Sequence, residues 1–179
     1  MDFRPISLTA TLSKIAEHYV VHEHVEPAVL KRLGTDQFGC IPGSSTAHAL
    51  INLLHNWAQA TDGTGNTVRI FALDCRKAFD LIDHSLLLAK LSVYNINPYI
   101  VNWITAFLKD SKQRVKLAHD CLSEWGSIRV GVPQGTKLEP WLFLVKMNDL
   151  KVPSASDCIK YEDDTKVYEI VSKNSPSNA

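Results

Sequence analysis

The sequence predicts an α+β domain whose antiparallel sheet is backed by helices. Long segments with the apolar spacing of amphipathic helices alternate along the chain with short strand-like segments. Two pairs of these strand-like segments are separated by turns, as in β-hairpins. The 179 residues suffice for one domain with a hydrophobic core, and no clear linker divides them.

The first part of the chain contains two predicted helices, residues 9–21 and 43–60. The first ends near Pro27, and Ser44 or Ser45 can cap the second. Each helix has one apolar face, formed by Leu12, Ile15, Ala16, Tyr19 and Val20 in the first and by Ala47, Leu50, Leu54 and Trp57 in the second.

The middle of the chain contains a predicted central strand followed by two predicted helices. Residues 68–74, VRIFALD, form a short and mostly apolar run, which favours a strand covered on both faces. Residues 85–94 and 97–110 have helical patterns, and the second helix has Asn97 as its cap and Pro98 as its first helical residue.

The last part of the chain contains two predicted hairpins with a helix between them. Residues 113–118 and 126–132 alternate in polarity and predict the first hairpin. Residues 139–150 predict a helix that follows a proline. Residues 158–161 and 165–171 predict the second hairpin, whose turn is acidic.

The acidic turn, formed by Glu162, Asp163 and Asp164, has two interpretations. It is either a solvated turn between two strands or half of a divalent-metal site. Asp74 closes the predicted central strand, so the carboxylates converge at one end of the sheet if the last hairpin lies beside that strand. Such a cluster suits Mg²⁺, which prefers hard oxygen ligands.

Composition limits the classes of function. Lys and Arg number 19, as do Asp and Glu, so the net charge is formally zero and nucleic-acid binding must rest on local sites. The four cysteines are widely spaced, which indicates reduced thiols in an intracellular protein. We expect neither a signal peptide nor a membrane span.

Five sequence blocks, in this order, resemble the reverse transcriptase domain of LINE-type (non-LTR) retrotransposons: RPISL, QFGCIPGSST, LDCRKAFDLIDH, GVPQG with LFLVKMNDL, and YEDD. The resemblance implies a partial reverse transcriptase domain over residues 1–179 with the right-hand polymerase fold. Fingers would occupy about 1–66 and mainly palm about 67–171, with 172–179 a disordered or cut tail. The thumb is expected to be missing, as is any endonuclease domain of the parent protein.

The same resemblance implies an RNA-directed DNA polymerase that adds dNTPs to the 3′ end of a DNA primer on an RNA template. Its cofactor would be two Mg²⁺ ions, with Mn²⁺ as a possible substitute. It would act in the nucleus, the cytoplasm or both, as a ribonucleoprotein. The alternative is a catalytically silent, decayed or domesticated fragment that serves only as a binding module; a different palm-type nucleotidyl transferase is disfavoured by the KAFD and PQG blocks.

The resemblance also assigns residues. Asp74, Asp163 and Asp164 would be catalytic metal ligands, joined by the backbone carbonyl of Cys75. The nucleotide-binding set would be Arg4, Lys77, Ala78, Phe79, Gln134 and Gly135, with the Phe79 ring as the steric gate against a 2′-hydroxyl. Without the resemblance Phe79 would be assigned to the core, and Asp80 and Asp83 are expected to cap the next helix.

Three residues depart from the family pattern and support the silent-fragment alternative. Glu162 replaces a small or apolar residue and is expected to face the primer as an uncompensated charge, screened only by Lys160 and Lys166. Glu139 and Trp141 replace a glycine and an aliphatic residue, and Trp141 is bulky for a position packed under the palm.

Overall fold

The computed structural model describes residues 6–109, 111–118, 121–152 and 156–173. The chain forms two compact units. The helical unit comprises Met1–Arg32 and Lys77–Lys146, and the sheet unit comprises Leu33–Arg76 and Met147–Ala179. Within the described residues, no helix is long and apolar enough to cross a membrane.

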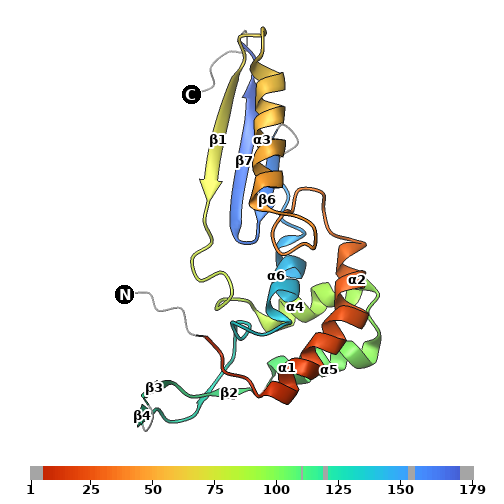
Figure 1. Ribbon diagram of the computed structural model, residues 1–179, viewed down its shortest axis with the longest axis vertical. Coiled ribbons are helices and arrows are strands. Elements are labelled where there is room, and N and C mark those ends of the chain that lie inside the picture. The colour runs from red at the N-terminus through yellow and green to blue at the C-terminus, as the bar shows by residue number, and fades with distance from the viewer. Residues whose placement is uncertain (1–5, 110, 119–120, 153–155, 174–179) are drawn as a thin grey trace. The chain divides into compact units, whose positions relative to one another are not determined.

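The sheet unit is built on three antiparallel strands in the order β1 (Thr67–Leu73), β7 (Asp164–Val171) and β6 (Ser156–Tyr161). The register of β1 and β7 runs from the Thr67–Val171 pair to the Leu73–Thr165 pair. Helix α3 (Thr46–Thr61) runs along this sheet (Figure 1). The predicted antiparallel sheet with a helix against it is therefore confirmed. The prediction that the first strand is central and covered on both faces is wrong, because β1 is an edge strand and most of its residues are exposed.

Helix α3 packs on the sheet through a face that shares only Trp57 with the one predicted. Its buried residues are Ala49 and Leu53, whereas Leu50 and Leu54 are exposed. Two apolar stripes run along this helix, and periodicity alone cannot rank them. The capping prediction is confirmed, because the Ser45 side chain accepts a hydrogen bond from the backbone N–H of His48.

The helical unit begins with α1 (Thr11–Val20), which continues through a π-helical turn, η1 (Val21–Val25), into α2 (Glu26–Leu30). The helix therefore continues past Pro27 and ends at Leu30. The predicted apolar face is wrong except at Val20, which is buried: Leu12, Ile15 and Tyr19 are exposed, and Glu17 is buried instead.

Among the described residues, the helical unit contains four further helices: α4 (His84–Leu91), η2 (Ser92–Tyr94), α5 (Pro98–Leu108) and α6 (Glu139–Met147). Met147, the last residue of α6, belongs to the sheet unit. Asn97 caps α5 as predicted, accepting a hydrogen bond from the Tyr99 N–H. Leucines dominate the fully buried side chains here: Leu87, Leu91, Leu108, Leu138, Leu142 and Leu144.

The predicted hairpin of the helical unit is present with short paired stretches. Strand β2 (Lys112–Gln113) pairs with β5 (Gly126–Ser127), and β3 (Lys116–Ala118) pairs with β4 (Cys121–Leu122).

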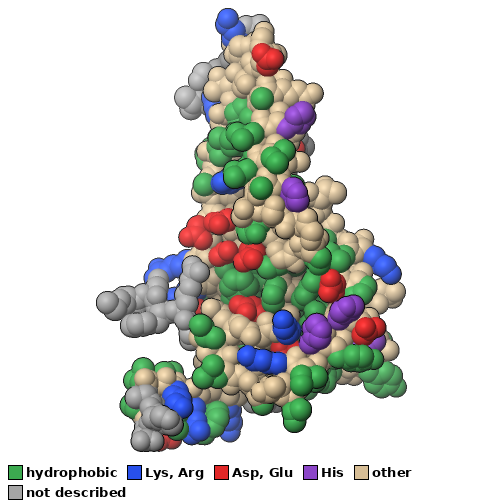
Figure 2. Space-filling model, viewed as in Figure 1, with side chains coloured by type: hydrophobic (Ala, Val, Ile, Leu, Met, Phe, Trp, Pro, Cys, Tyr) green, Lys and Arg blue, Asp and Glu red, His purple; other side chains and the backbone are tan. Residues whose placement is uncertain are grey.

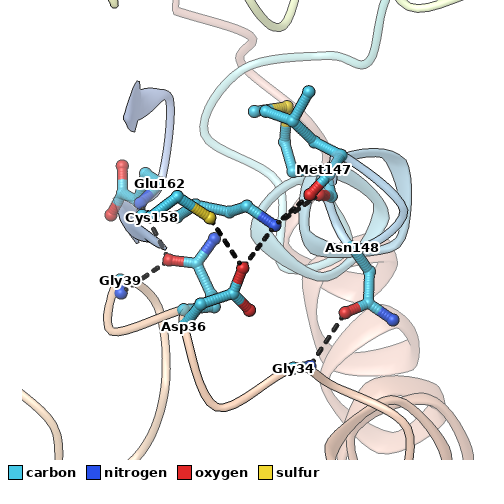
Figure 3. A network of polar contacts seen from close by, with 10 residues as sticks. Gly34, Asp36, Gly39, Met147, Asn148, Cys158 and Glu162 are labelled. Atoms are coloured by element: carbon cyan, nitrogen blue, oxygen red, sulfur yellow. Dashed lines mark hydrogen bonds and ion pairs between the residues drawn. The ribbon is translucent and has the colours of Figure 1, made fainter. Parts of the chain in front are cut away.

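The sheet unit contains a buried ion pair. Lys160, in β6, is almost fully buried, and its Nζ lies 2.8 Å from Oδ2 of Asp36. The same Nζ donates to the carbonyls of Leu150, at 2.8 Å, and Met147, at 3.3 Å (Figure 3). The expectation that Lys160 screens Glu162 is therefore wrong, because its charge is already neutralised by Asp36.

The Asp36 carboxylate also accepts a hydrogen bond from the Cys158 thiol, at 3.2 Å. Burial by itself would raise the pKa of Asp36, but hydrogen bonds from Lys160 and Cys158 and the charge of Lys160 together hold that pKa below its ordinary value. Burial and the adjacent carboxylate raise the pKa of the Cys158 thiol to about 11. The thiol therefore stays protonated and continues to donate.

Replacing Asp36 with Asn should lower the free energy of unfolding by about 3 kcal/mol at pH 7, because the Lys160 ammonium is left buried without a counter-charge. The pKa of Asp36 is lower in the folded chain, so its stabilisation is present above its ordinary pKa of 3.8 and is lost as pH falls through the folded value. Urea unfolding followed by circular dichroism should therefore show the two chains converging at acid pH.

Asp62→Asn is the matched control, since Asp62 is an exposed carboxylate at the end of α3. It should change the unfolding free energy by less than about 0.5 kcal/mol. An Asp36→Asn chain as stable as this control would show that the ion pair is not a structural requirement.

Candidate metal and nucleotide sites

The candidate metal ligands lie at one end of the sheet. Asp74 directly follows the last residue of β1, which pairs with Thr165. Asp164 begins β7 and pairs with Tyr161 of β6, so Glu162 and Asp163 form the two-residue turn of the β6–β7 hairpin. The expectation that this hairpin lies beside the first strand is confirmed. Continued by one residue, the register places Asp74 opposite Asp164.

The donors at this end of the sheet suit a hard divalent cation. Asp74 and Asp164 are exposed, and Asp163 and Cys75 are partly buried. Carboxylate and carbonyl oxygens are the ligands that Mg²⁺ takes in proteins. Among the described residues, however, no group of three or more His, Cys, Asp and Glu side chains is arranged to hold a metal ion. The strand register brings Asp74 and Asp164 to the same end of the sheet, but their side chains would have to turn toward one another to share an ion.

The turn formed by Glu162 and Asp163 is held by residues 36–40. Glu162 has a left-handed backbone, with φ of 56°, which is unfavourable for a residue with a side chain. Its N–H donates to Oε1 of Gln37, at 3.2 Å, and its carboxylate accepts from the Cys40 thiol, at 2.9 Å. The expectation of an unpartnered Glu162 carboxylate is therefore wrong.

Residues 36–39 pair with β6 like a short additional strand. The Phe38 N–H donates to the Lys160 carbonyl, at 2.8 Å, and the Lys160 N–H donates to the Asp36 carbonyl, at 2.7 Å. The buried Gln37 side chain then accepts from the N–H groups of Gly39 and Glu162 (Figure 3). One carboxamide oxygen thus joins this segment to the turn.

Gly39 lies where a side chain has no room. A Cβ at this position would lie 2.2 Å from the Glu162 backbone nitrogen. The sequence analysis assigned no role to Gln37 or Gly39, although both belong to the QFGCIPGSST block. The detectable signal was a glutamine two residues before a glycine, which is too common to identify this contact without the structure.

The residues predicted to bind nucleotide belong to the helical unit, except that Arg4 lies outside the described residues. The half-buried Phe79 ring packs on Phe143, with centroids 4.4 Å apart. Ala78 is buried, whereas Lys77 is exposed and has a left-handed backbone with φ of 52°. Phe79 is thus anchored by another ring and has a partly accessible surface.

The structure brings Gln134 together with Asp80, because Nε2 of Gln134 donates to Oδ1 of Asp80, at 2.9 Å. The prediction that Asp80 caps the next helix is therefore wrong. The same prediction for Asp83 is confirmed, since its carboxylate accepts from the Leu86 N–H at the start of α4. Gly135 has φ of 86°, a conformation that glycine adopts without strain.

Two of the unusual residues fit their surroundings. Glu139 accepts a hydrogen bond from the Gly135 N–H, while its own N–H donates to the Thr136 hydroxyl, at 3.3 Å. This arrangement is similar to a capping box at the start of α6. Trp141 is buried among the core residues of the helical unit. Neither side chain disrupts the local fold.

The fold of the chain is similar to that of two solved telomerase structures. The chain resembles a telomerase from Candida albicans, with a TM-score of 0.60 at 10% identity over 88% of this chain and 29% of that one. A telomerase from Candida tropicalis matches with a TM-score of 0.62 at 11% identity, over 89% of this chain and 29% of the other. Both were solved in complex with a fragment of telomeric RNA.

The chain belongs to the reverse transcriptase (RNA-dependent DNA polymerase) family, whose sequence profile matches residues 1–174. It is 32% identical over 155 residues to a probable RNA-directed DNA polymerase from transposon BS of Drosophila melanogaster. It is 28% identical over 151 residues to the Pol polyprotein of retrotransposable element R2 of Popillia japonica. The resemblance to LINE-type reverse transcriptases is therefore confirmed.

These matches cover 86% and 83% of this chain but only 17% and 20% of the two relatives. The chain thus spans about a fifth of the length of the relatives it matches.

Replacing Gly39 with Ala should lower the free energy of unfolding by about 2 kcal/mol or more, because the new methyl group overlaps the backbone of Glu162. Gly126→Ala is the matched control, since the nearest atom to a Cβ there is 3.8 Å away. Urea unfolding of both variants tests this prediction. Equal stabilities would show that the close approach of Gly39 to the turn is not required.

Proposed function

We propose that this chain carries the nucleotidyl-transfer centre of an RNA-directed DNA polymerase, with residues 1–66 as fingers, 67–171 as mainly palm and 172–179 as a tail. The observation that carries the proposal is the strand order β1-β7-β6, which brings the end of β1 and the β6–β7 turn to one end of the sheet. Family membership supports polymerase chemistry there.

In this proposal Asp74, Asp163 and Asp164 hold two Mg²⁺ ions with the Cys75 carbonyl as an additional ligand, and Mn²⁺ can substitute. Bound divalent cations would activate a primer 3′-hydroxyl and neutralise the charge on the triphosphate. The exposure of Asp74 and Asp164 leaves them accessible to ions from solvent. The Gln37 contact fixes the backbone next to Asp163, which limits how far that ligand can move.

The proposed nucleotide contacts are those of the helical unit. Phe79 excludes a 2′-hydroxyl, and its packing on Phe143 holds the ring in one orientation. Gln134 and Gly135 contact the incoming nucleotide and the template base, with Gln134 oriented by Asp80. The backbone of Lys77 and Ala78 lies near the triphosphate, which Arg4 also faces; an arginine fork suits phosphate.

The proposed partners are an RNA template, a DNA primer and dNTPs, within an intracellular ribonucleoprotein of the nucleus, cytoplasm or both. A thumb, and possibly an endonuclease domain, would come from other parts of a longer parent protein. This choice of substrate class is supported by the similarity to RNA-directed DNA polymerases of transposon BS, the X-element and mobile element jockey.

A catalytically silent binding module is the second candidate. The observation that favours it is the lack, among the described side chains, of a group already arranged to hold a metal ion. The accommodation of Glu162 by Cys40 and of Glu139 by Gly135 weakens it, because these substitutions leave the local structure intact.

Replacing Asp74 with Asn should lower Mg²⁺-dependent primer extension by more than about a hundredfold, because loss of a direct ligand should exceed the loss of an outer-shell partner. The assay uses this chain joined to the C-terminal remainder of a related LINE-type polymerase. Asp62→Asn is the control and should leave the rate unchanged.

Equal extension rates for Asp74→Asn and the unaltered chain would remove the metal assignment. No extension by the unaltered chain, while its fold and Mn²⁺ binding persist, would favour the silent binding module.

Replacing Phe79 with Val should raise the use of NTPs relative to dNTPs in the same assay, because the ring that meets the 2′-hydroxyl is gone. Phe143→Val removes the partner ring and should cost similar packing without changing this ratio. Steady-state incorporation of matched dNTP and NTP pairs gives the measurement. A ratio that shifts equally in both variants would assign Phe79 to packing alone.

A further inference from the structure

A basic hairpin of the helical unit, residues 111–118 and 121–129, has no role in the chemistry proposed above. Its exposed cations Lys112, Arg114 and Lys116 occupy alternate positions along one strand. The facing residues Gly126 and Ser127 are uncharged. The whole chain has no net charge, so this row of three cations is a local concentration.

Hydrogen bonds continue between the two paired stretches of the hairpin. The Ser123 N–H donates to the Val115 carbonyl, and the Val115 N–H donates to the Ser123 hydroxyl, each at 2.9 Å. The Ile128 N–H donates to the Ser111 carbonyl, at 2.9 Å. These bonds link β2 and β3 along one side of the hairpin, and the register is irregular only beyond Lys116, so alternation over residues 112–116 would direct the three cations to one face.

An aromatic ring lies beside this row of cations. The Arg114 guanidinium lies over Trp125, 4.7 Å from the ring centroid, and Trp125 is 58% exposed. No ion pair joins Lys112, Arg114 or Lys116 to another described residue. These three cations thus have no ion-pair partner among the described residues, where Glu124 is the one acidic side chain of the hairpin, and the Trp125 ring offers a surface for stacking. Figure 2 shows Lys and Arg side chains gathered with hydrophobic ones over this hairpin.

We propose that the basic hairpin binds the phosphate backbone of single-stranded nucleic acid, with Trp125 and Arg114 as a stacking platform for a base. Successive cations on one face of a strand are about 7 Å apart, a spacing suited to successive phosphates of an extended strand. Charged contacts that follow the backbone, combined with an aromatic platform, are typical of single-strand binding. The choice of a template RNA as the ligand rests on the proposed function, whereas phosphate binding does not.

The test is fluorescence anisotropy of a labelled single-stranded RNA of about 20 nucleotides, titrated with the whole chain in EDTA at several salt concentrations. The variant Lys112→Gln/Arg114→Gln/Lys116→Gln should bind at least about tenfold more weakly at low salt. Its slope of log affinity against log salt should be shallower by about 2, because three phosphate contacts are lost.

Two matched variants serve as controls. Lys31→Gln/Lys151→Gln/Lys173→Gln removes three exposed cations elsewhere and should leave the slope unchanged. Lys112→Arg/Arg114→Lys/Lys116→Arg keeps the charges and should retain the wild-type slope.

The stacking platform is tested separately. Trp125→Phe should remove the quenching of tryptophan fluorescence that RNA is expected to cause in the unaltered chain. DNA of the same sequence should show the same slope; tighter RNA binding indicates the template and tighter DNA binding the primer.

A charge-removed hairpin that binds RNA as tightly as the Lys31, Lys151 and Lys173 control overturns the proposal. The proposal is also overturned if the same Gln variant keeps RNA binding but loses self-association in analytical ultracentrifugation. The hairpin would then be a contact between protein chains. Because EDTA removes divalent cations, neither outcome depends on the metal site. Asp62→Asn, at an exposed carboxylate outside every proposed site, should bind RNA like the unaltered chain.

Discussion

The buried ammonium group of Lys160 is the constraint on which the sheet unit depends. A lysine in the interior is stable only where a counter-charge and hydrogen-bond acceptors reach it. Asp36 supplies the charge, and the carbonyls of Met147 and Leu150 supply acceptors. Asp36 and residues 147–150 must therefore both lie beside the Lys160 side chain. The contact with Asp36 fixes residues 36–39 against β6.

The position of residues 36–39 determines the conformation of the turn that Glu162 and Asp163 form. Gln37 can reach the Glu162 N–H only because its neighbours pair with β6. The left-handed backbone at Glu162 costs roughly 1–2 kcal/mol, which the Gln37 hydrogen bond and the Cys40 contact offset. We infer that the position of the proposed ligand Asp163 depends on residues 36–39, none of which is a proposed ligand.

The elements of the fold were largely predictable from the sequence, because caps and strand alternation are local signals. Ser45, Asp83 and Asn97 cap their helices as predicted. The buried helix faces were not predictable where two apolar stripes compete, as in α3. Burial of Lys160 was also unpredictable, since its partner lies 124 positions earlier in the numbering and no local pattern links the two. The aspartates were located by family resemblance rather than by periodicity.

The central claim is that Asp74 and the β6–β7 turn bind the same divalent cations. The most direct measurement is anomalous diffraction from a crystal of the chain soaked in Mn²⁺. The account predicts anomalous density within about 2.2 Å of carboxylate oxygens from both Asp74 and Asp163, a distance close to that of Mg²⁺ coordination. Density that contacts neither residue, or only one of them at saturating Mn²⁺, would contradict it.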